Sequence, residues 1–257
     1  MADPILSLRR VTRDFGPFRA VDNVTLDIMP GTITGLIGPN GAGKTTLFNV
    51  LTGMLPPSSG QVLFRGQDVT RLPPDVLFAL GLGRTFQIPR PFARMSVLEN
   101  VMLAPLAQVG EQLSGPFLKA REMRTQEEAI REKALEVLAF VTLDALADQA
   151  AGQISGGQMK LLELARILMG DPELILLDEP AAGVNPSLTK LLIDKIEELN
   201  RGGKTFLIIE HDMDFVMQHC NPVIALAEGK TVFQGTPEEA QANLLLLDAY
   251  LGTTADD

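Results

Sequence analysis

The sequence predicts an α/β protein whose central sheet is parallel and buried. Two short runs, 174–178 and 205–209, are apolar except for Asp178 at the end of the first and Thr205 at the start of the second, in the manner of strands that are covered on both faces. A glycine-rich run joins a strand-like segment at 32–37 to a helix-like segment at 46–51. Strands that alternate with helices in this way are typical of open α/β sheets.

The N-terminal part predicts a small antiparallel sheet beside that core. Residues 5–28 contain two apolar strand-like runs separated by Phe15-Gly16-Pro17. A short hairpin follows at 62–69, with its turn at Arg65-Gly66. We expect these strands to wrap around the parallel core as a separate β subdomain.

The glycine-rich run has the composition and spacing of a phosphate-binding P-loop. Its glycines carry no Cβ, so the backbone can curl and point N–H groups inward, and the helix that follows adds its positive end. We expect Lys44 to reach the β- and γ-phosphates and Thr45 to hold Mg²⁺. A plain glycine-rich turn with a surface lysine would not need both flanking elements. The predicted nucleotide contacts are Gly38, Pro39, Asn40, Gly41, Ala42, Gly43, Lys44, Thr45 and Thr46.

Polar residues also follow the two buried strands of the core. Asp178-Glu179 follow the first and Glu210-His211 the second. Ligands of open parallel sheets bind at the carboxyl ends of the strands, so these groups are expected beside the P-loop. Asp178 is placed as a Mg²⁺ carboxylate, Glu179 as the group that activates water, and His211 as a γ-phosphate contact. The alternative is that they are solvated strand ends.

A second anion site is predicted at the start of an apolar helix, 159–169. It is formed by Ser155, Gly156, Gly157 and Gln158, which follow Ile154. Ser155 is a good N-cap, and the two glycines leave N–H groups bare at the helix start. A plain capped helix is the simpler interpretation. In a dimer, however, both anion sites could bind the same nucleotide, if each nucleotide lies between the P-loop of one chain and the Ser155 segment of the other.

The middle of the chain predicts a helical lobe inserted into the α/β core. Glu127 to Val141 places its apolar residues on one helical face, and 104–118 is a loop-rich insertion before it. We expect a single domain, 1–257, with a core of about 1–89 and 166–257 and a lobe of about 90–165. After the lobe we expect a helix opened by Asn185-Pro186, a hairpin at 223–234 and a helix at 237–251.

The bulk composition restricts the partners of the chain. A formal net charge of −10 and a pI of about 4.8 argue against nucleic-acid binding, which needs an electropositive face. The single cysteine, Cys220, excludes an internal disulfide framework. No apolar run approaches the roughly 18–20 residues that span a bilayer, and no signal-peptide pattern is present. We therefore expect any membrane role to depend on a partner.

These motifs together resemble the ATP-binding subunits of ABC transporters. The P-loop, Gln87 in Arg84-Thr-Phe-Gln87, the ISGGQ run at 154–158, the strand with its carboxylates at 174–179 and His211 occur in the order of that family. The resemblance covers essentially the whole chain. It implies an ABC-type ATPase fold, with ATP and Mg²⁺ as cofactors.

The resemblance also implies roles for individual residues. Phe15 matches the aromatic residue that stacks on adenine, where relatives often have tyrosine. Gln87 matches the glutamine that contacts Mg²⁺ and the attacking water, beside Asp178 for the metal and Glu179 as the catalytic base. His211 matches the switch histidine. Asn185 stands where many relatives have aspartate, and Ile154 where leucine is usual.

Further stretches, among them Glu179 to Pro186 and Ile209 to Met213, are similar to the ATPases of branched-chain amino-acid importers. The family implies a homodimer, or a heterodimer with a paralogue, on the cytoplasmic side of the inner membrane. Its partners would be permease subunits and, indirectly, a solute-binding protein. Lipopolysaccharide- or lipid-export ATPases, and an ABC ATPase without a membrane partner, remain alternatives at this level.

Overall fold

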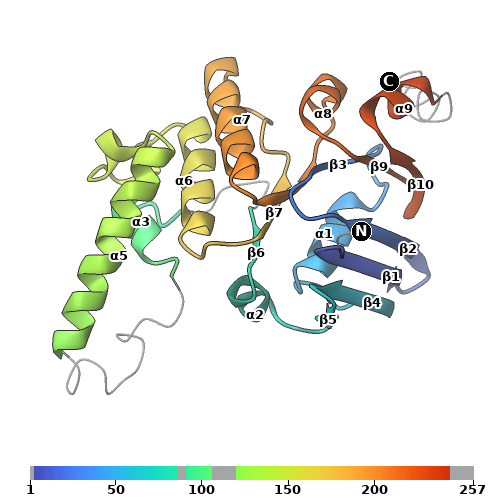
Figure 1. Ribbon diagram of the computed structural model, residues 1–257, viewed down its shortest axis with the longest axis horizontal. Helices are drawn as coiled ribbons and strands as arrows, with labels where there is room; N and C mark the ends of the chain where they lie inside the picture. The colour runs from blue at the N-terminus through green and yellow to red at the C-terminus, as the bar shows by residue number, and fades with distance from the viewer. Residues whose placement is uncertain (1–2, 86–90, 106–119, 244–257) are drawn as a thin grey trace. The chain divides into compact units, whose positions relative to one another are not determined.

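The structure, a computed structural model, describes residues 3–85, 91–105 and 120–243 (Figure 1). The chain forms two compact units. The first, here called the sheet unit, comprises Met1–Arg84, Glu173–Pro180 and Glu198–Asp257. The second, the helical unit, comprises Thr85–Pro172 and Ala181–Glu197. The domain boundaries expected from the sequence stay a prediction.

The sheet unit contains the predicted antiparallel sheet. Its four strands are ordered β2-β1-β4-β5. They are β1 (Leu6–Phe15), β2 (Phe18–Ile28), β4 (Ser59–Phe64) and β5 (Gln67–Asp68). The β1–β2 hairpin closes with Phe15 opposite Phe18. Phe15 therefore lies at the tip of a hairpin and not within the core.

A six-stranded sheet forms the centre of the same unit, in the order β10-β9-β3-β8-β7-β6. Its strands are β3 (Ile33–Ile37), β6 (Leu82–Arg84), β7 (Leu174–Asp178), β8 (Thr205–Ile209), β9 (Val223–Ala227) and β10 (Lys230–Gly235). All pairs are parallel except β9 with β10. Every residue of β7 and β8 is buried, including Asp178 and Thr205, and the other, apolar residues of the two strands predict this.

Short helices complete the sheet unit. They are α1 (Lys44–Leu51), α2 (Pro74–Ala79), α8 (Met213–His219) and α9 (Pro237–Ala242). The apolar residues of α1, such as Leu47 and Phe48, join a core that also contains Leu8 of β1 and Leu176 of β7. This packing fixes the helix that follows the glycine-rich loop against both sheets. The helix expected at 237–251 is shorter than predicted: α9 ends at Ala242, because Asn243 adopts an extended backbone with φ = −86° and ψ = 103°. Residues 244–257 lie outside the described residues.

The helical unit is built from α3 (Val97–Met102), α5 (Ala120–Phe140), α6 (Gly156–Leu168) and most of α7 (Pro186–Arg201), whose end belongs to the sheet unit. The 3₁₀ turns Asp144–Leu146 and Ala151–Gln153 lie between α5 and α6. Ala134 and Leu138 of α5 are buried, in agreement with the predicted apolar face. Most of the expected insertion at 104–118 lies outside the described residues.

Neither a membrane-spanning helix nor a cluster of metal-binding side chains occurs in the described ranges. Their helices are too short or too polar to cross a bilayer. Within the same ranges, no group of three or more His, Cys, Asp or Glu side chains is arranged to hold a metal ion.

Candidate nucleotide-binding site

Polar residues gather at one edge of the six-stranded sheet. β3 leads into Gly38, β8 leads into Glu210, β7 ends at Asp178 and β6 ends at Arg84. These four strands are parallel and follow one another as β3-β8-β7-β6, so their carboxyl ends share an edge. The sheet thus brings together the three polar clusters that the sequence predicts there, and it adds Arg84.

The loop after β3 has a positive φ at three glycines, a backbone conformation that favours glycine. Gly38 has φ = 152°, Gly41 has φ = 81° and Gly43 has φ = 97°. A Cβ at Gly38 would collide with the carbonyl oxygen of Leu226, and one at Gly43 with that of Ala20. The neighbouring strands therefore press directly on the loop, which explains both glycines without reference to a ligand. Gly41, by contrast, has open space where its Cβ would lie.

The apex of this loop is held by the turn between β9 and β10. The N–H of Gly229 donates to the carbonyl oxygen of Ala42 at 3.0 Å. The carbonyl of Gly229 in turn accepts from the N–H of Asp22 on β2 at 2.8 Å. The glycine-rich loop is therefore connected through two backbone hydrogen bonds to the hairpin that carries Phe15. Sequence reasoning missed this connection because it depends on strand order.

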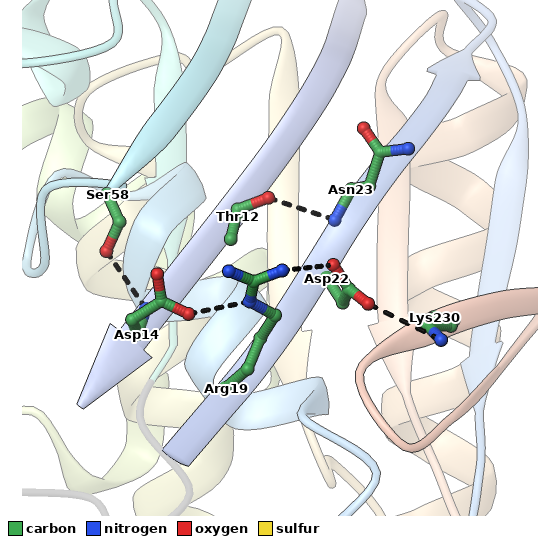
Figure 2. A network of polar contacts seen from close by, with 7 residues as sticks. All are labelled: Thr12, Asp14, Arg19, Asp22, Asn23, Ser58 and Lys230. Carbon is green, nitrogen blue, oxygen red and sulfur yellow. Dashed lines mark hydrogen bonds and ion pairs between the residues drawn. The ribbon is translucent and has the colours of Figure 1, made fainter. Parts of the chain in front are cut away.

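Figure 2 shows how charged side chains reinforce the same connection. Arg19 donates to Asp14 Oδ1 at 2.8 Å and to Asp22 Oδ1 at 3.1 Å, and Lys230 Nζ lies 3.4 Å from Asp22 Oδ2. These side chains are partly exposed, so water and salt screen each pair. Their combined effect is to align the end of the β1–β2 hairpin with the β9–β10 turn.

Lys44 begins α1 and its side chain folds back over the loop. Nζ donates to the carbonyl oxygens of Gly38 and Pro39 at 2.6 and 3.0 Å. Burial lowers the pKa of Lys44, while the negative charges of Glu179 and Asp178 act in the opposite direction. A cation held over a glycine-rich loop at the start of a helix is suited to a polyphosphate.

Asp178 is a buried carboxylate that interacts with Arg84. Nη2 of Arg84 lies 3.2 Å from Asp178 Oδ2, and both side chains are at least nine-tenths buried. Burial raises the pKa of Asp178, and Arg84 is the strongest influence that lowers it. Arg84 was missed as a site residue. The sequence feature that could have indicated a role for Arg84 is its position three residues before the predicted site residue Gln87.

Glu179 and His211 lie beside each other at the same edge. Glu179 adopts φ = 48°, and its N–H donates to the carbonyl of Ile209 on β8 at 3.0 Å. His211 Nδ1 is 3.9 Å from Glu179 Oε1 and 3.8 Å from Glu210 Oε2. These distances exceed those of a hydrogen bond. The imidazole is largely exposed, and Asp212 caps α8 directly after it.

Phe15 presents a large part of its ring to solvent. The side chain is 43% exposed, and the guanidinium carbon of Arg13 lies 4.7 Å from the ring centroid. One face of the ring is therefore covered by a cation, which is a favourable arrangement for an aromatic quadrupole. An exposed aromatic ring on a hairpin that is tied to the loop is suited to stacking on a planar base.

The predicted second anion site belongs to the helical unit. Ser155 caps α6 through a capping box: its Oγ accepts from the N–H of Gln158 at 3.3 Å, and Gln158 Oε1 accepts from the N–H of Ser155 at 2.8 Å. A Cβ at Gly157 would meet Leu188 and Val184, whereas one at Gly156 would meet nothing within 4 Å. Gly156 is thus exposed at the helix start, and Gly157 is required by packing.

Gln87, which the sequence predicts as a ligand of Mg²⁺, lies outside the described residues.

The loop, the lysine and the carboxylates at the strand ends define a P-loop nucleotide-binding protein with groups suited to phosphoryl chemistry. Comparison with known proteins gives the family. The ABC transporter family model matches residues 21–182. The chain therefore belongs to the ABC transporter family and is an ATP-hydrolysing, ATP-binding subunit of that class.

Individual relatives match over nearly their full length. The chain is 40% identical to the probable branched-chain amino acid transport ATP-binding protein LivG of Archaeoglobus fulgidus, covering 96% of this chain and 95% of the relative. It is also 40% identical to the high-affinity branched-chain amino acid transport ATP-binding protein LivG of Escherichia coli K12, covering 98% and 99%.

Solved structures agree on the fold. A nucleotide-free ATP-binding cassette of an ABC transporter superposes with a TM-score of 0.83 at 37% identity, covering 96% of this chain and 98% of that one. A cassette in its ADP conformation gives the same TM-score and identity, covering 97% and 99%. A cassette solved as a dimer with ADP and phosphate has a TM-score of 0.74 at 26% identity, covering 90% and 98%. The ABC-type α/β fold predicted from the sequence is confirmed.

Proposed function

We propose that this chain hydrolyses ATP to energise a membrane importer of branched-chain amino acids. The observation that carries the proposal is the full-length similarity, at 40% identity, to branched-chain amino acid transport ATP-binding proteins of an archaeon and a bacterium. The sheet edge supports it, because the groups that ATP hydrolysis needs lie there together. Transport inward, and a peripheral place on the cytoplasmic side of the membrane, are parts of the same proposal.

ATP binding is assigned to the glycine-rich loop and the hairpin beside it. The N–H groups of the loop and Lys44 hold the phosphates, and Phe15 stacks on the adenine. The hydrogen bonds that connect Ala42, Gly229 and Asp22 keep these two parts of the site at a constant separation. The base and the phosphates are therefore positioned by one rigid piece of the sheet unit.

Mg²⁺ fits the residues at this edge. The oxygens of Thr45, Gln87 and Asp178 are hard donors, and Mg²⁺ prefers a few such ligands supplemented by phosphate oxygens and water. When bound, the ion would neutralise charge on the phosphates.

Hydrolysis is assigned to Glu179 and His211. Glu179 directly follows the metal carboxylate, so it can accept a proton from a water in line with the γ-phosphate. His211, close to Glu179 at 3.9 Å, can donate to the γ-phosphate. A closed site also needs the exposed start of α6, with Ser155, Gly156 and Gln158, from a second copy of the chain. Two copies suffice because each carries both halves of the site.

The segment 88–100 is proposed to receive the membrane subunits. In its described part, Phe92 is 53% exposed, while Asn100 is fully buried. Asn100 Oδ1 accepts from the N–H of Phe92 at 2.8 Å, and Nδ2 donates to the carbonyls of Ser96 and Phe92 at 2.9 and 3.1 Å. The hydrogen bonds of Asn100 thus hold the loop and leave the aromatic side chain of Phe92 available to a partner.

The chemical part of the proposal is tested with Glu179→Gln. The amide retains the size of the side chain but cannot accept the proton, so ATP turnover should fall roughly 10²- to 10⁴-fold while ATP binding persists. Glu238→Gln, an exposed acid in α9, serves as the control and should match the wild type. Turnover near the wild-type rate in Glu179→Gln would remove Glu179 as the base.

The transport part is tested with the tagged chain in native membranes. We expect it to co-purify with integral membrane subunits and, after reconstitution with them, to support ATP-dependent uptake of labelled leucine. Lys44→Ala should abolish the uptake because the phosphates lose their cation. ATP hydrolysis without leucine uptake would reject the substrate and leave the ATPase assignment intact.

A further inference from the structure

Arg84 is a buried charged residue of the sheet edge to which the proposed reaction assigns no role. It ends β6, and its side chain is 8% exposed. Nη1 donates to Asn49 Oδ1 at 2.6 Å and to Thr52 Oγ1 at 3.1 Å. Nη2 donates to Asp178 Oδ2 at 3.2 Å. One planar group therefore holds both the end of α1 and the end of β7.

The two elements that Arg84 joins carry the proposed metal ligands. Thr45 is the second residue of α1, and Asp178 is the last residue of β7. Mg²⁺ requires near-ideal octahedral geometry with ligand distances of about 2.0–2.1 Å. A small shift of α1 relative to β7 would move one ligand out of range. The spacing of these elements is thus a quantity that the site must control.

We propose that Arg84 is a positioning residue that holds the Asp178 carboxylate at the distance from Thr45 that bound Mg²⁺ requires. The inference rests on the proposed function, because it takes Asp178 as a metal ligand. Arginine suits this task better than lysine does. Its guanidinium presents donors in a rigid fork, so Nη1 and Nη2 fix α1 and β7 at the same time.

The alternative is an ion pair that only stabilises the fold. The chain provides a matched comparison at the other end of the same strand. Arg65 Nη1 lies 2.7 Å from Glu173 Oε1, directly before β7, with both side chains about half exposed. Arg65→Lys therefore repeats the change at an arginine–carboxylate pair that is remote from the metal ligands. A lysine at either position keeps the charge and removes the fork.

The experiment measures binding of Mn²⁺, a spectroscopic substitute for Mg²⁺, to the full-length chain saturated with the non-hydrolysable analogue AMP-PNP. Electron paramagnetic resonance gives the Mn²⁺ affinity, and thermal melting reports folding. We expect Mn²⁺ affinity to fall about 10- to 100-fold in Arg84→Lys, the range typical when a partner that orients a metal ligand is removed. Arg65→Lys should bind Mn²⁺ as the wild type does. AMP-PNP binding without metal should be unchanged in both.

Further variants distinguish a failure of the proposed metal role of Asp178 from a failure of the positioning role of Arg84. Asp178→Asn should also weaken Mn²⁺ binding; if it does not, the proposed metal role of Asp178 is wrong. If Asp178→Asn weakens binding and folded Arg84→Lys does not, the positioning role is overturned. Should Arg84→Lys fail to fold, the double variant Asn49→Ala/Thr52→Val decides, because it removes both anchors at the end of α1 and leaves the Asp178 contact. Wild-type Mn²⁺ affinity in the folded double variant would overturn the inference.

Discussion

Lys44 and Asp178 are charged side chains that the fold buries at the sheet edge. Burial lowers the pKa of Lys44 and raises that of Asp178, so the surroundings disfavour the charged form of each. Neighbouring opposite charges counteract this effect: Glu179 for Lys44 and Arg84 for Asp178. A bound triphosphate would add negative charge beside Lys44 and so favour the ammonium form. Groups whose pKa is shifted by burial and by specific charged partners are typical of functional sites.

Phe15 allows a direct test of base recognition. In Phe15→Ala the stacking surface is lost, and since stacking of a base on an aromatic side chain is worth about 1–3 kcal/mol, the Kd for ATP should rise about 5- to 150-fold. Isothermal titration calorimetry measures it. The affinity for inorganic tripolyphosphate should stay the same, because the loop that binds the phosphates is untouched.

Phe18→Ala is the matched control for this prediction. Phe18 faces Phe15 across the β1–β2 turn and is more exposed, at 62% against 43%. It should bind ATP with wild-type affinity. If the two variants weaken ATP binding equally, the loss reflects damage to the hairpin, and Phe15 has no specific contact with the base.

At the scale of elements, the start of α6 separates two glycines that look equivalent in the sequence. Gly157 faces α7 and the residues just before it, where a Cβ would come within 2.6 Å of Leu188 Cδ1 and 2.9 Å of Val184 Cγ1. Gly156 faces open space. Packing within the helical unit therefore requires glycine at position 157. At position 156 no packing contact requires glycine, which fits close approach of an external group.

This difference predicts opposite phenotypes for two alanine variants. Gly157→Ala should lower the free energy of unfolding by about 1–3 kcal/mol, the usual cost of overpacking. Gly156→Ala should unfold at or above the wild-type denaturant concentration and bind ATP normally, but lose turnover because the added methyl blocks the second nucleotide contact. Urea unfolding and ATPase rates check both. Full turnover in Gly156→Ala would contradict the proposed contact.

Elements with a local signature could be predicted, and contacts between distant elements could not. The apolar runs at 174–178 and 205–209, the loop glycines and the Ser155 cap follow from short patterns, and the structure contains all of them. The pairing of β3 with β8 is not encoded in either strand alone. Arg84 lies 35 positions from Asn49 and 94 from Asp178, so its contacts depend on the order of the strands in the six-stranded sheet, where β6 lies beside β7.

For the whole molecule, the main claim is that two chains share each nucleotide. The sheet unit supplies the phosphate loop, Asp178 and Glu179, and the helical unit supplies the exposed start of α6. In this proposal a single chain carries two kinds of anion site, and a symmetric pair uses both. A related cassette has been solved as a dimer with ADP and phosphate. Loss of the γ-phosphate would remove contacts that hold the closed pair, so hydrolysis would open it.

Crosslinking between two single-cysteine chains tests this claim most directly. Cys220 is the chain's only cysteine and is buried, which raises the pKa of its thiol to about 12 and keeps it unreactive near neutral pH. Asn40→Cys and Ser155→Cys are introduced into separate copies of the Glu179→Gln variant, mixed, and treated with a short bifunctional thiol reagent. We predict a crosslinked dimer that forms with ATP and Mg²⁺ and is absent without nucleotide. No crosslinked dimer with ATP, or an equal amount with and without it, would contradict the shared site.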